Sequence, residues 1–166
     1  AAKFLSDNDI RFENTEVAVL CAGGEEAGLR GTKAFLKANK DALKADGVET
    51  IFVTIDTIRE LEFSKIYDKD MTGMVKNDIR VAKLIQSAAK NVGLDVPIGP
   101  IDLGATDSAA ASQAGFPASS FVAMNPAPAR YYHTRLDTAD NLSAQAIDTT
   151  VKLAIETVFL YDEQGI

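Results

Sequence analysis

The sequence predicts an α/β domain with a largely parallel sheet. Short, nearly all-apolar runs, typical of strands covered on both faces, alternate along the chain with amphipathic stretches of helical period. The 166 residues are 46% hydrophobic and 25% charged, which is the composition of an ordinary globular chain. This length fits one domain, because domains usually contain roughly 100–200 residues. No linker, repeat or low-complexity tract divides residues 1–166, so we expect a single domain.

The first half of the chain predicts two strands and one helix. Residues 16–22 (EVAVLCA) form a β-branched apolar run, which predicts a buried strand that ends at a pair of glycines. Leucines at near-helical spacing predict a helix from about residue 25 to residue 44. Residues 50–56 (TIFVTID) predict a second buried strand that ends on an acid.

The two clearest helices lie in the second half. Residues 77–92 form an amphipathic pattern, with Asn77 or Asp78 as its cap and Gly93 as its stop signal. Residues 143–161 carry an apolar stripe that predicts a long C-terminal helix.

The remaining segments are shorter or less regular. Residues 119–124 (SSFVAM) predict a further short strand, whereas residues 59–76 carry no pattern clear enough to assign. All five prolines lie between residues 97 and 128. Proline marks irregular backbone, where binding sites are often built.

Charge and composition exclude several classes of protein. With 17 Lys and Arg against 24 Asp and Glu, the net charge is −7, and no basic cluster suits nucleic acid or anionic lipid. No apolar run approaches the roughly 20 residues of a membrane helix. The lone Cys21 excludes an internal disulfide and a Cys-rich zinc site. The lone His133 excludes a site that needs two imidazoles from these residues.

The start of the chain indicates a fragment. There is no initiator Met, and the opening AAKFL resembles the tail of a helix already under way. We therefore expect the N-terminal part of the domain to be missing. No signal peptide is visible, and the localisation stays open between cytoplasmic and secreted.

Glu25 and Glu26 stand at a predicted strand-to-helix junction, where open α/β sheets bind ligands. The neighbouring glycines lack the G-x-G-x-x-G spacing, and two carboxylates would repel a phosphate. Acids at a helix start also suit the helix dipole, and this structural role is the commoner one. The functional alternative is that one carboxylate binds a metal while the other acts as a general base.

Two further residues, Asp56 and His133, could belong to the same site as the glutamate pair. Asp56 closes an apolar strand, either facing the same crevice or capping the next element. His133 lies in a polar loop with Asp137 and Asp140 nearby in sequence. A metal-binding imidazole generally needs a carboxylate or carbonyl on its other nitrogen, although Asp137 and Asp140 could instead cap the last helix.

The segment around Asp107 is the last candidate. Residues 104–108 (GATDS) follow an apolar run and can be an ordinary loop before a short helix. A serine triad is a weak alternative here, because no G-x-S-x-G elbow exists.

Taken in order, these motifs carry a resemblance. The succession GGEEAGLRGTKAF, TID, LGATDSAAASQAGFPA and YYHTRLDTADN resembles the zinc-dependent aminopeptidases of metallopeptidase family twenty-eight, of the bacterial leucyl aminopeptidase type. The resemblance extends from about Glu16 to the last helix. It implies a three-layer α/β/α fold with a mostly parallel mixed sheet, like that of zinc exopeptidases, and a peptide substrate.

The resemblance also implies roles for individual residues. Glu25 matches the general base, and Tyr132 matches a position that can hydrogen-bond the developing oxyanion. Glu26 and His133 match ligands of one zinc, and Asp56 matches a ligand of the other. Asp107 resembles an acid of a family motif, although Ser108 follows it where the family often has histidine. Asp137 is near His133 in sequence, and we expect both acids to support the metal ligands or face the substrate.

The family also uses an upstream histidine and an aspartate that bridges two zinc ions, and neither can be placed in this chain. The ligand set is therefore incomplete, because a zinc site normally has three protein ligands and a water. We expect the parent protein to be a dizinc aminopeptidase and this fragment alone to be inactive.

Other readings stay open at this stage. A non-catalytic peptidase-like domain that serves in binding or assembly is the alternative, and a nucleotide-binding domain is disfavoured by the glutamate pair. Phe116, Phe121 and Met124 could line a pocket for the substrate side chain or pack in the core. The residue preference and the oligomeric state, homo-oligomer included, cannot be read from the sequence.

Overall fold

A computed structural model describes residues 1–125 and 131–166 of the chain. Helices and strands alternate along it, as the sequence predicts. In chain order the elements are α1 (Ala2–Asp7), α2 (Arg30–Leu43), β1 (Phe52–Ile58), η1 (Leu61–Phe63), β2 (Ser64–Asp70), β3 (Val75–Lys76), α3 (Ile79–Asn91), β4 (Ile98–Pro100), α4 (Asp107–Gln113), β5 (Ala118–Ala123), η2 (Ala139–Asn141) and α5 (Ala144–Gln164).

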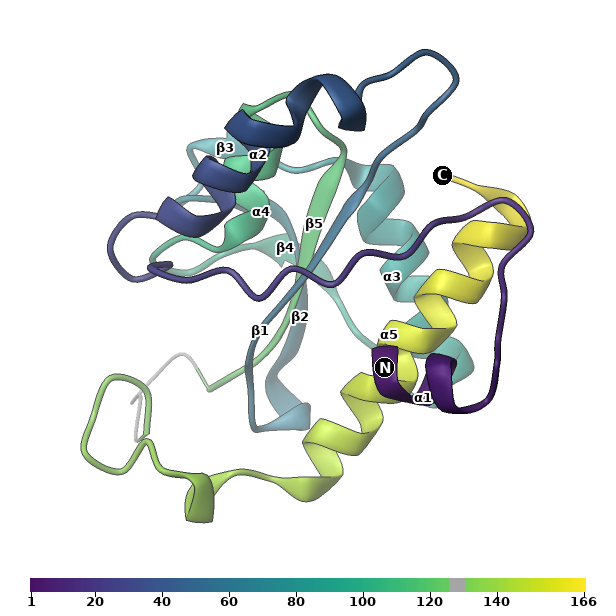
Figure 1. The fold of residues 1–166 in the computed structure, drawn as a ribbon. Helices are drawn as coiled ribbons and strands as arrows, with labels where there is room; N and C mark the ends of the chain where they lie inside the picture. Colours follow the sequence, from purple (N-terminus) through teal and green to yellow (C-terminus); the bar gives the residue numbers. More distant parts are fainter. Residues whose placement is uncertain (126–130) are drawn as a thin grey trace.

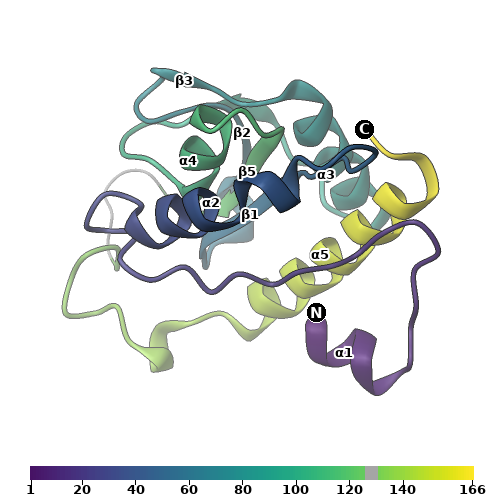
Figure 2. The same ribbon diagram turned by 45° about the horizontal axis from the view of Figure 1, so that its top comes forward.

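The elements form three layers. Figures 1 and 2 show α2 and α4 on one face of the sheet and α3 and α5 on the other. The sheet order is β1-β5-β2-β3, and β4 pairs with β2 beside this path. β1 pairs with β5 and β4 with β2 in parallel, whereas β5 and β3 run antiparallel to β2. The α/β class and the mixed sheet are thus confirmed.

The parallel pairing of β1 and β5 decides where a site can form. Asp56 of β1 lies beside Val122 of β5, and both strands end within two residues of this pair. The register shifts between Asp56 and Ile58, because Thr57 adopts a positive φ of 43°. A β-branched residue is strained in this conformation. The carboxyl ends of two neighbouring strands therefore meet at one edge of the sheet.

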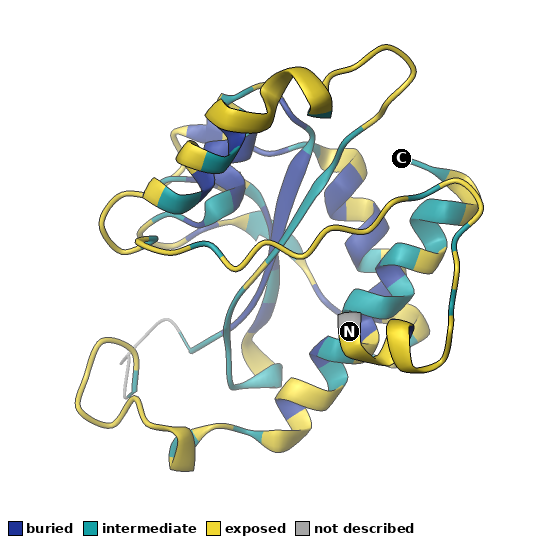
Figure 3. Ribbon diagram, in the orientation of Figure 1, coloured by how far each residue is buried: buried dark blue, intermediate teal, exposed yellow. Residues whose placement is uncertain are grey.

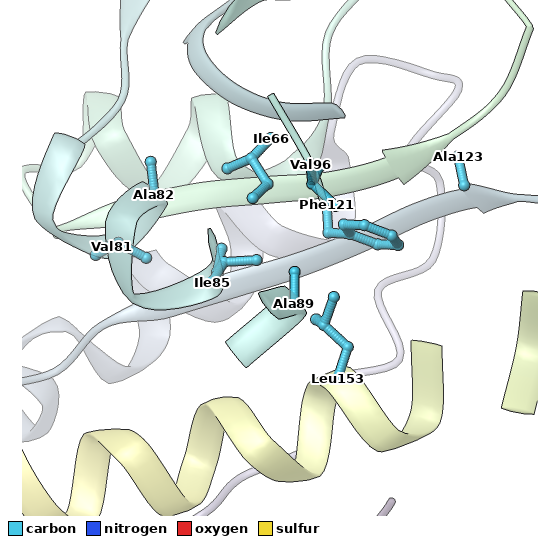
Figure 4. Close-up of a cluster of buried hydrophobic side chains, with 9 residues drawn as sticks. All are labelled: Ile66, Val81, Ala82, Ile85, Ala89, Val96, Phe121, Ala123 and Leu153. Atoms are coloured by element: carbon cyan, nitrogen blue, oxygen red, sulfur yellow. The ribbon is translucent and has the colours of Figure 1, made fainter. Parts of the chain in front are cut away.

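Each face of the sheet carries an apolar cluster. Figure 4 shows the cluster on the α3 and α5 side, where Phe121 and Ile66 of the sheet meet Ile85 of α3 and Leu153 of α5. The second cluster joins α2 and α4 to the other face. Figure 3 shows that the buried residues gather on the sheet and on the inward faces of these helices.

Two of the three predicted helices, α3 and α5, begin at a side-chain cap. The Asp78 carboxylate accepts a hydrogen bond from the Arg80 amide and begins α3, and Gly93 with φ +85° follows its end. Ser143 caps α5 by accepting a hydrogen bond from the Ala146 amide, so neither Asp137 nor Asp140 serves this purpose. Within the described ranges, no helix is both long and apolar enough to cross a membrane.

The predicted strand at residues 16–22 is wrong. This segment runs as an irregular chain between α2 and α5 (Figures 1 and 2) and makes no backbone-to-backbone hydrogen bond within the described residues. Val17, Val19 and Leu20 are 38%, 65% and 40% exposed. An apolar run predicts the tendency to form a strand, but a strand exists only where its backbone pairs with a neighbouring strand, and this segment makes no such pairing within the described residues.

A buried polar network joins β2 to the segment before α4. The fully buried carboxylate of Asp70 accepts hydrogen bonds from the Met71 and Thr106 amides and from the hydroxyls of Thr106 and Ser108. The hydroxyl of Ser120 on β5 extends the network to Thr54 of β1. The network fixes the start of α4, where Asp107 lies, against the sheet.

Candidate active site

A cavity of about 260 Å³ opens at the carboxyl ends of β1 and β5. Three segments that are distant in sequence supply most of its polar side chains. They are the turn before α2, the end of β1 and the loop of residues 131–142, and the residues predicted from the sequence in this lining are Glu26, Asp56, Tyr132, His133 and Asp137.

Glu26 and His133 meet directly in this site. The imidazole Nε2 of His133 lies 2.8 Å from Oε1 of Glu26, although 107 residues separate them in sequence. The ring of Tyr132 stacks on that of His133, with centroids 3.8 Å apart and planes inclined by 17°. His133 has a φ of 55°, an uncommon conformation for a residue other than glycine, which places its side chain toward the turn before α2.

The turn that carries the two glutamates depends on its glycines. The Gly31 amide donates to the Gly23 carbonyl, and a Cβ atom on Gly31 would lie 2.4 Å from that oxygen. Only glycine permits this approach. Glu25 and Glu26 therefore project from a tight turn, and α2 begins only at Arg30, so neither acid lies in the first turn of that helix.

Four carboxylates share the electrostatic environment of this site. Burial, followed by the charges of Asp56, Glu26 and Asp107, raises the pKa of Glu25 to about 7. Burial also raises the pKa of Asp56, although the hydrogen bond from the Thr57 hydroxyl opposes this shift. Asp107 belongs to the same group, and its Oδ1 is buried without a hydrogen-bond partner in the described structure.

Tyr132 is suited to donate a hydrogen bond into the cavity. Burial, with smaller effects from the carboxylates of Glu26 and Asp56, raises the pKa of its phenol. The hydroxyl therefore keeps its proton at neutral pH.

The described residues do not form a complete metal site. No group of three or more His, Cys, Asp or Glu side chains in the described ranges is arranged to hold an ion. Glu26 and His133 are close enough to share one, whereas Asp56 lies apart from this pair on β1. Carboxylate oxygens and an imidazole nitrogen are donors that zinc accepts, so the donor types fit and their number falls short.

The three candidate pocket residues have different positions. Met124 lines the cavity. Phe116 lies in the cluster beneath α2 and α4, where its ring packs edge-on against Phe52, and Phe121 is fully buried in the opposite cluster.

Sequence reasoning missed Arg59 and Glu60, which also line the cavity. They follow β1 in a region without periodicity, and no motif marks them. The only sequence signal is that they closely follow Asp56 along the chain.

The raised pKa of Glu25 predicts a pH-dependent stability in the metal-free chain. The folded state binds this proton more tightly than the unfolded state, whose ordinary pKa is 4.5. The resulting stabilisation is present below pH 4.5 and lost as the pH rises through about 7. We expect Glu25→Gln to raise the melting temperature at pH 8 and to have little effect near pH 5, as measured by thermal unfolding with a chelator present.

Glu16→Gln is the matched control, because Glu16 is exposed on the irregular segment before the turn. It should leave the melting temperature unchanged at both pH values. An equal rise for Glu25→Gln at pH 5 and pH 8 would contradict the electrostatic explanation.

Solved structures with a similar fold include several aminopeptidases. LapA of Legionella pneumophila has a TM-score of 0.68 at 18% identity, over 86% of this chain and 39% of that chain. The zinc aminopeptidase BSAP of Bacillus subtilis has a TM-score of 0.61 at 19% identity, over 83% of this chain and 34% of that one. The aminopeptidase of Aneurinibacillus sp. strain AM-1 has a TM-score of 0.64 at 25% identity, over 83% of this chain and 31% of that one. A search of curated protein sequences found no significant match.

The chain thus spans less than two fifths of the length of each of these three structures. The sequence itself matches a family model, described as Peptidase family M28, over residues 1–158. This match covers nearly all of the described elements. The chain therefore belongs to Peptidase family M28.

Proposed function

We propose that this chain supplies part of the catalytic site of a zinc-dependent aminopeptidase, which hydrolyses the N-terminal peptide bond of a peptide. The observation that carries the proposal is the meeting of Glu26 and His133, from opposite ends of the chain, in one cavity with Asp56. The acidic cavity is compatible with the positive N-terminus of a peptide.

In this proposal Glu26 and His133 hold one zinc ion, and Asp56 contributes to a second. Bound zinc supplies a Lewis acid that lowers the pKa of water and polarises the scissile carbonyl. Asp107 and Asp137 lie outside the ligand set. Asp107 contributes negative charge beside Glu25 and Asp56, and Asp137 lines the cavity, where it would contact the substrate.

The protein groups can perform the proton transfers of amide hydrolysis. Glu25 accepts the proton of the attacking water and passes it to the leaving amine. In the metal-free chain, burial and the neighbouring carboxylates raise the pKa of Glu25 to about 7, so this side chain takes up a proton more readily than an ordinary glutamate. Tyr132 keeps its proton and donates a hydrogen bond to the oxyanion that develops on the carbonyl oxygen.

The ligand count has a consequence for the isolated chain. Two ligands for one ion and one for the other are fewer than the three that zinc sites normally use. We expect weak zinc binding, and no robust hydrolysis of leucine p-nitroanilide when zinc is added. Calorimetry with Zn²⁺ should give an affinity that falls at least about tenfold in Glu26→Gln and in His133→Ala.

Asp148→Asn provides a control, because Asp148 forms an exposed pair with Lys152 on α5. It should bind zinc as the wild type does. Zinc binding that is indifferent to both Glu26→Gln and His133→Ala would contradict the proposed function. Robust, chelator-sensitive hydrolysis by the chain alone would instead contradict only the claim that it is inactive.

A further inference from the structure

Arg59 connects the sheet to the loop that carries His133. It lies immediately after β1, three residues beyond Asp56. The backbone amides of Arg59 and Glu60 both donate to the Ala123 carbonyl at the end of β5, each over 2.8 Å. The backbone of Arg59 is therefore fixed to the two strands that frame the cavity.

The side chain of Arg59 reaches both ends of the loop. Its Nε donates a hydrogen bond of 2.7 Å to the Asn141 carbonyl. Its guanidinium carbon lies 3.4 Å from the ring centroid of Tyr131, which is a close cation–π contact. Its Nη1 also lies 3.3 Å from Oε1 of Glu60, whose other oxygen accepts a hydrogen bond from the Asn125 amide.

The loop between these two contacts has its own internal hydrogen bonds. The amide and hydroxyl of Thr134 both donate to the Tyr131 carbonyl, and the Asn141 side-chain amide donates to the Leu136 carbonyl. The loop can therefore move as a unit, and its position depends on what holds its ends. His133 lies only two residues from Tyr131, so a displacement of Tyr131 displaces the imidazole.

The direct contact between His133 and Glu26 is too exposed to hold the loop by itself. The two side chains are 55% and 69% exposed, and exposed ion pairs contribute little. Arg59 is three-quarters buried, at 24% side-chain exposure, and it is the only Lys or Arg among the described residues that line the cavity. Its partners already engage the guanidinium, which favours a structural task over binding of a substrate.

We propose that Arg59 is a positioning residue, which holds the loop of residues 131–141 against the end of β1 and so sets the place of His133 relative to Asp56. Planarity is part of this role. A guanidinium can stack on Tyr131 and donate to Asn141 at the same time, whereas an ammonium group cannot reproduce that geometry. The inference rests on the proposed function, because it concerns a proposed zinc ligand.

The test uses Arg59→Gln and Arg59→Lys in the complete chain, with two readouts that require no activity. The first is the rate of trypsin cleavage after Arg135, an exposed residue of the loop. The second is the NMR signal of the imidazole, which reports on His133 alone because the chain has one histidine. We expect cleavage roughly tenfold faster in Arg59→Gln, because it follows the population of the open loop, together with a shifted imidazole signal. The cleavage rate and the imidazole signal of Arg59→Lys should lie between those of Arg59→Gln and the wild type.

Arg11→Gln is the matched control, because Arg11 pairs with Asp9 on the surface at 87% side-chain exposure. Its cleavage rate and imidazole signal should match the wild type. Unchanged cleavage and an unchanged signal in Arg59→Gln would overturn the proposal. A uniform rise in cleavage along the whole chain with an unchanged signal would do the same, because it would show a general loss of stability. Failure of zinc binding would contradict the proposed function but leave these two readouts unaffected.

Discussion

Replacing Asp70 with alanine should lower the free energy of unfolding by about 4 kcal/mol, as measured by urea denaturation. The Asp70 carboxylate is fully inaccessible and accepts four hydrogen bonds. Alanine would leave the amides of Met71 and Thr106 and the hydroxyls of Thr106 and Ser108 without their acceptor. Buried donors that lose their partners cost far more than the net gain of an ordinary hydrogen bond.

Asp70→Asn should be much milder, at about 1 kcal/mol. The remaining carbonyl oxygen of the amide can accept from the two backbone amides, which share Oδ1 of Asp70. The amide nitrogen can donate to the two hydroxyls, because a hydroxyl also accepts hydrogen bonds. An equal loss in the free energy of unfolding for Asp70→Ala and Asp70→Asn would show that the stability depends on the charge of Asp70 and not on the pattern of donors and acceptors.

Phe121→Ala should destabilise the domain by about 3–5 kcal/mol. Phe121 lies on β5, has no exposed surface and contacts the cluster that α3 and α5 share with the sheet (Figure 4). Removing the ring leaves a cavity where the sheet and both helices meet. Phe4→Ala on α1 is the control, because Phe4 is 48% exposed and should cost less than about 1 kcal/mol. A loss below about 1.5 kcal/mol for Phe121→Ala would mean that the core closes over the gap.

The elements that the sequence predicts well are those whose signals are local. Residues 77–92 and 143–161 combine a helical apolar period with a polar cap, and α3 and α5 begin one residue after Asp78 and Ser143. β2 was not predictable in this way. Its sequence SKIYDKD places its two apolar residues side by side and ends on three charged residues, so it lacks the alternation of a strand, and the register of its pairing with β4 shifts between Tyr67 and Lys69.

The site shows the same division between local and non-local information. Glu26 and His133 are identifiable because each stands in a family motif, and the fold brings them within hydrogen-bond distance. Arg59 and Asp70 lie in the stretch of residues 59–76 that carries no clear pattern. Their importance comes mainly from partners that are distant in sequence, such as Asn141 and Thr106. Contacts between residues that are far apart in the chain leave no periodic pattern in a single sequence.

The open side of β1 has a consequence for the behaviour of the chain in solution. Among the described residues no strand pairs with the outer edge of β1, and Ile55 is 40% exposed on it. Asp56 is the only charged residue in this strand, so apart from the irregular segment of residues 16–22, which runs along this side between α2 and α5, little protects the edge from pairing with a second molecule. Mutual repulsion between molecules of net charge −7 opposes that pairing. Dissolved salt screens the repulsion, so the colloidal stability of the chain decreases as ionic strength rises.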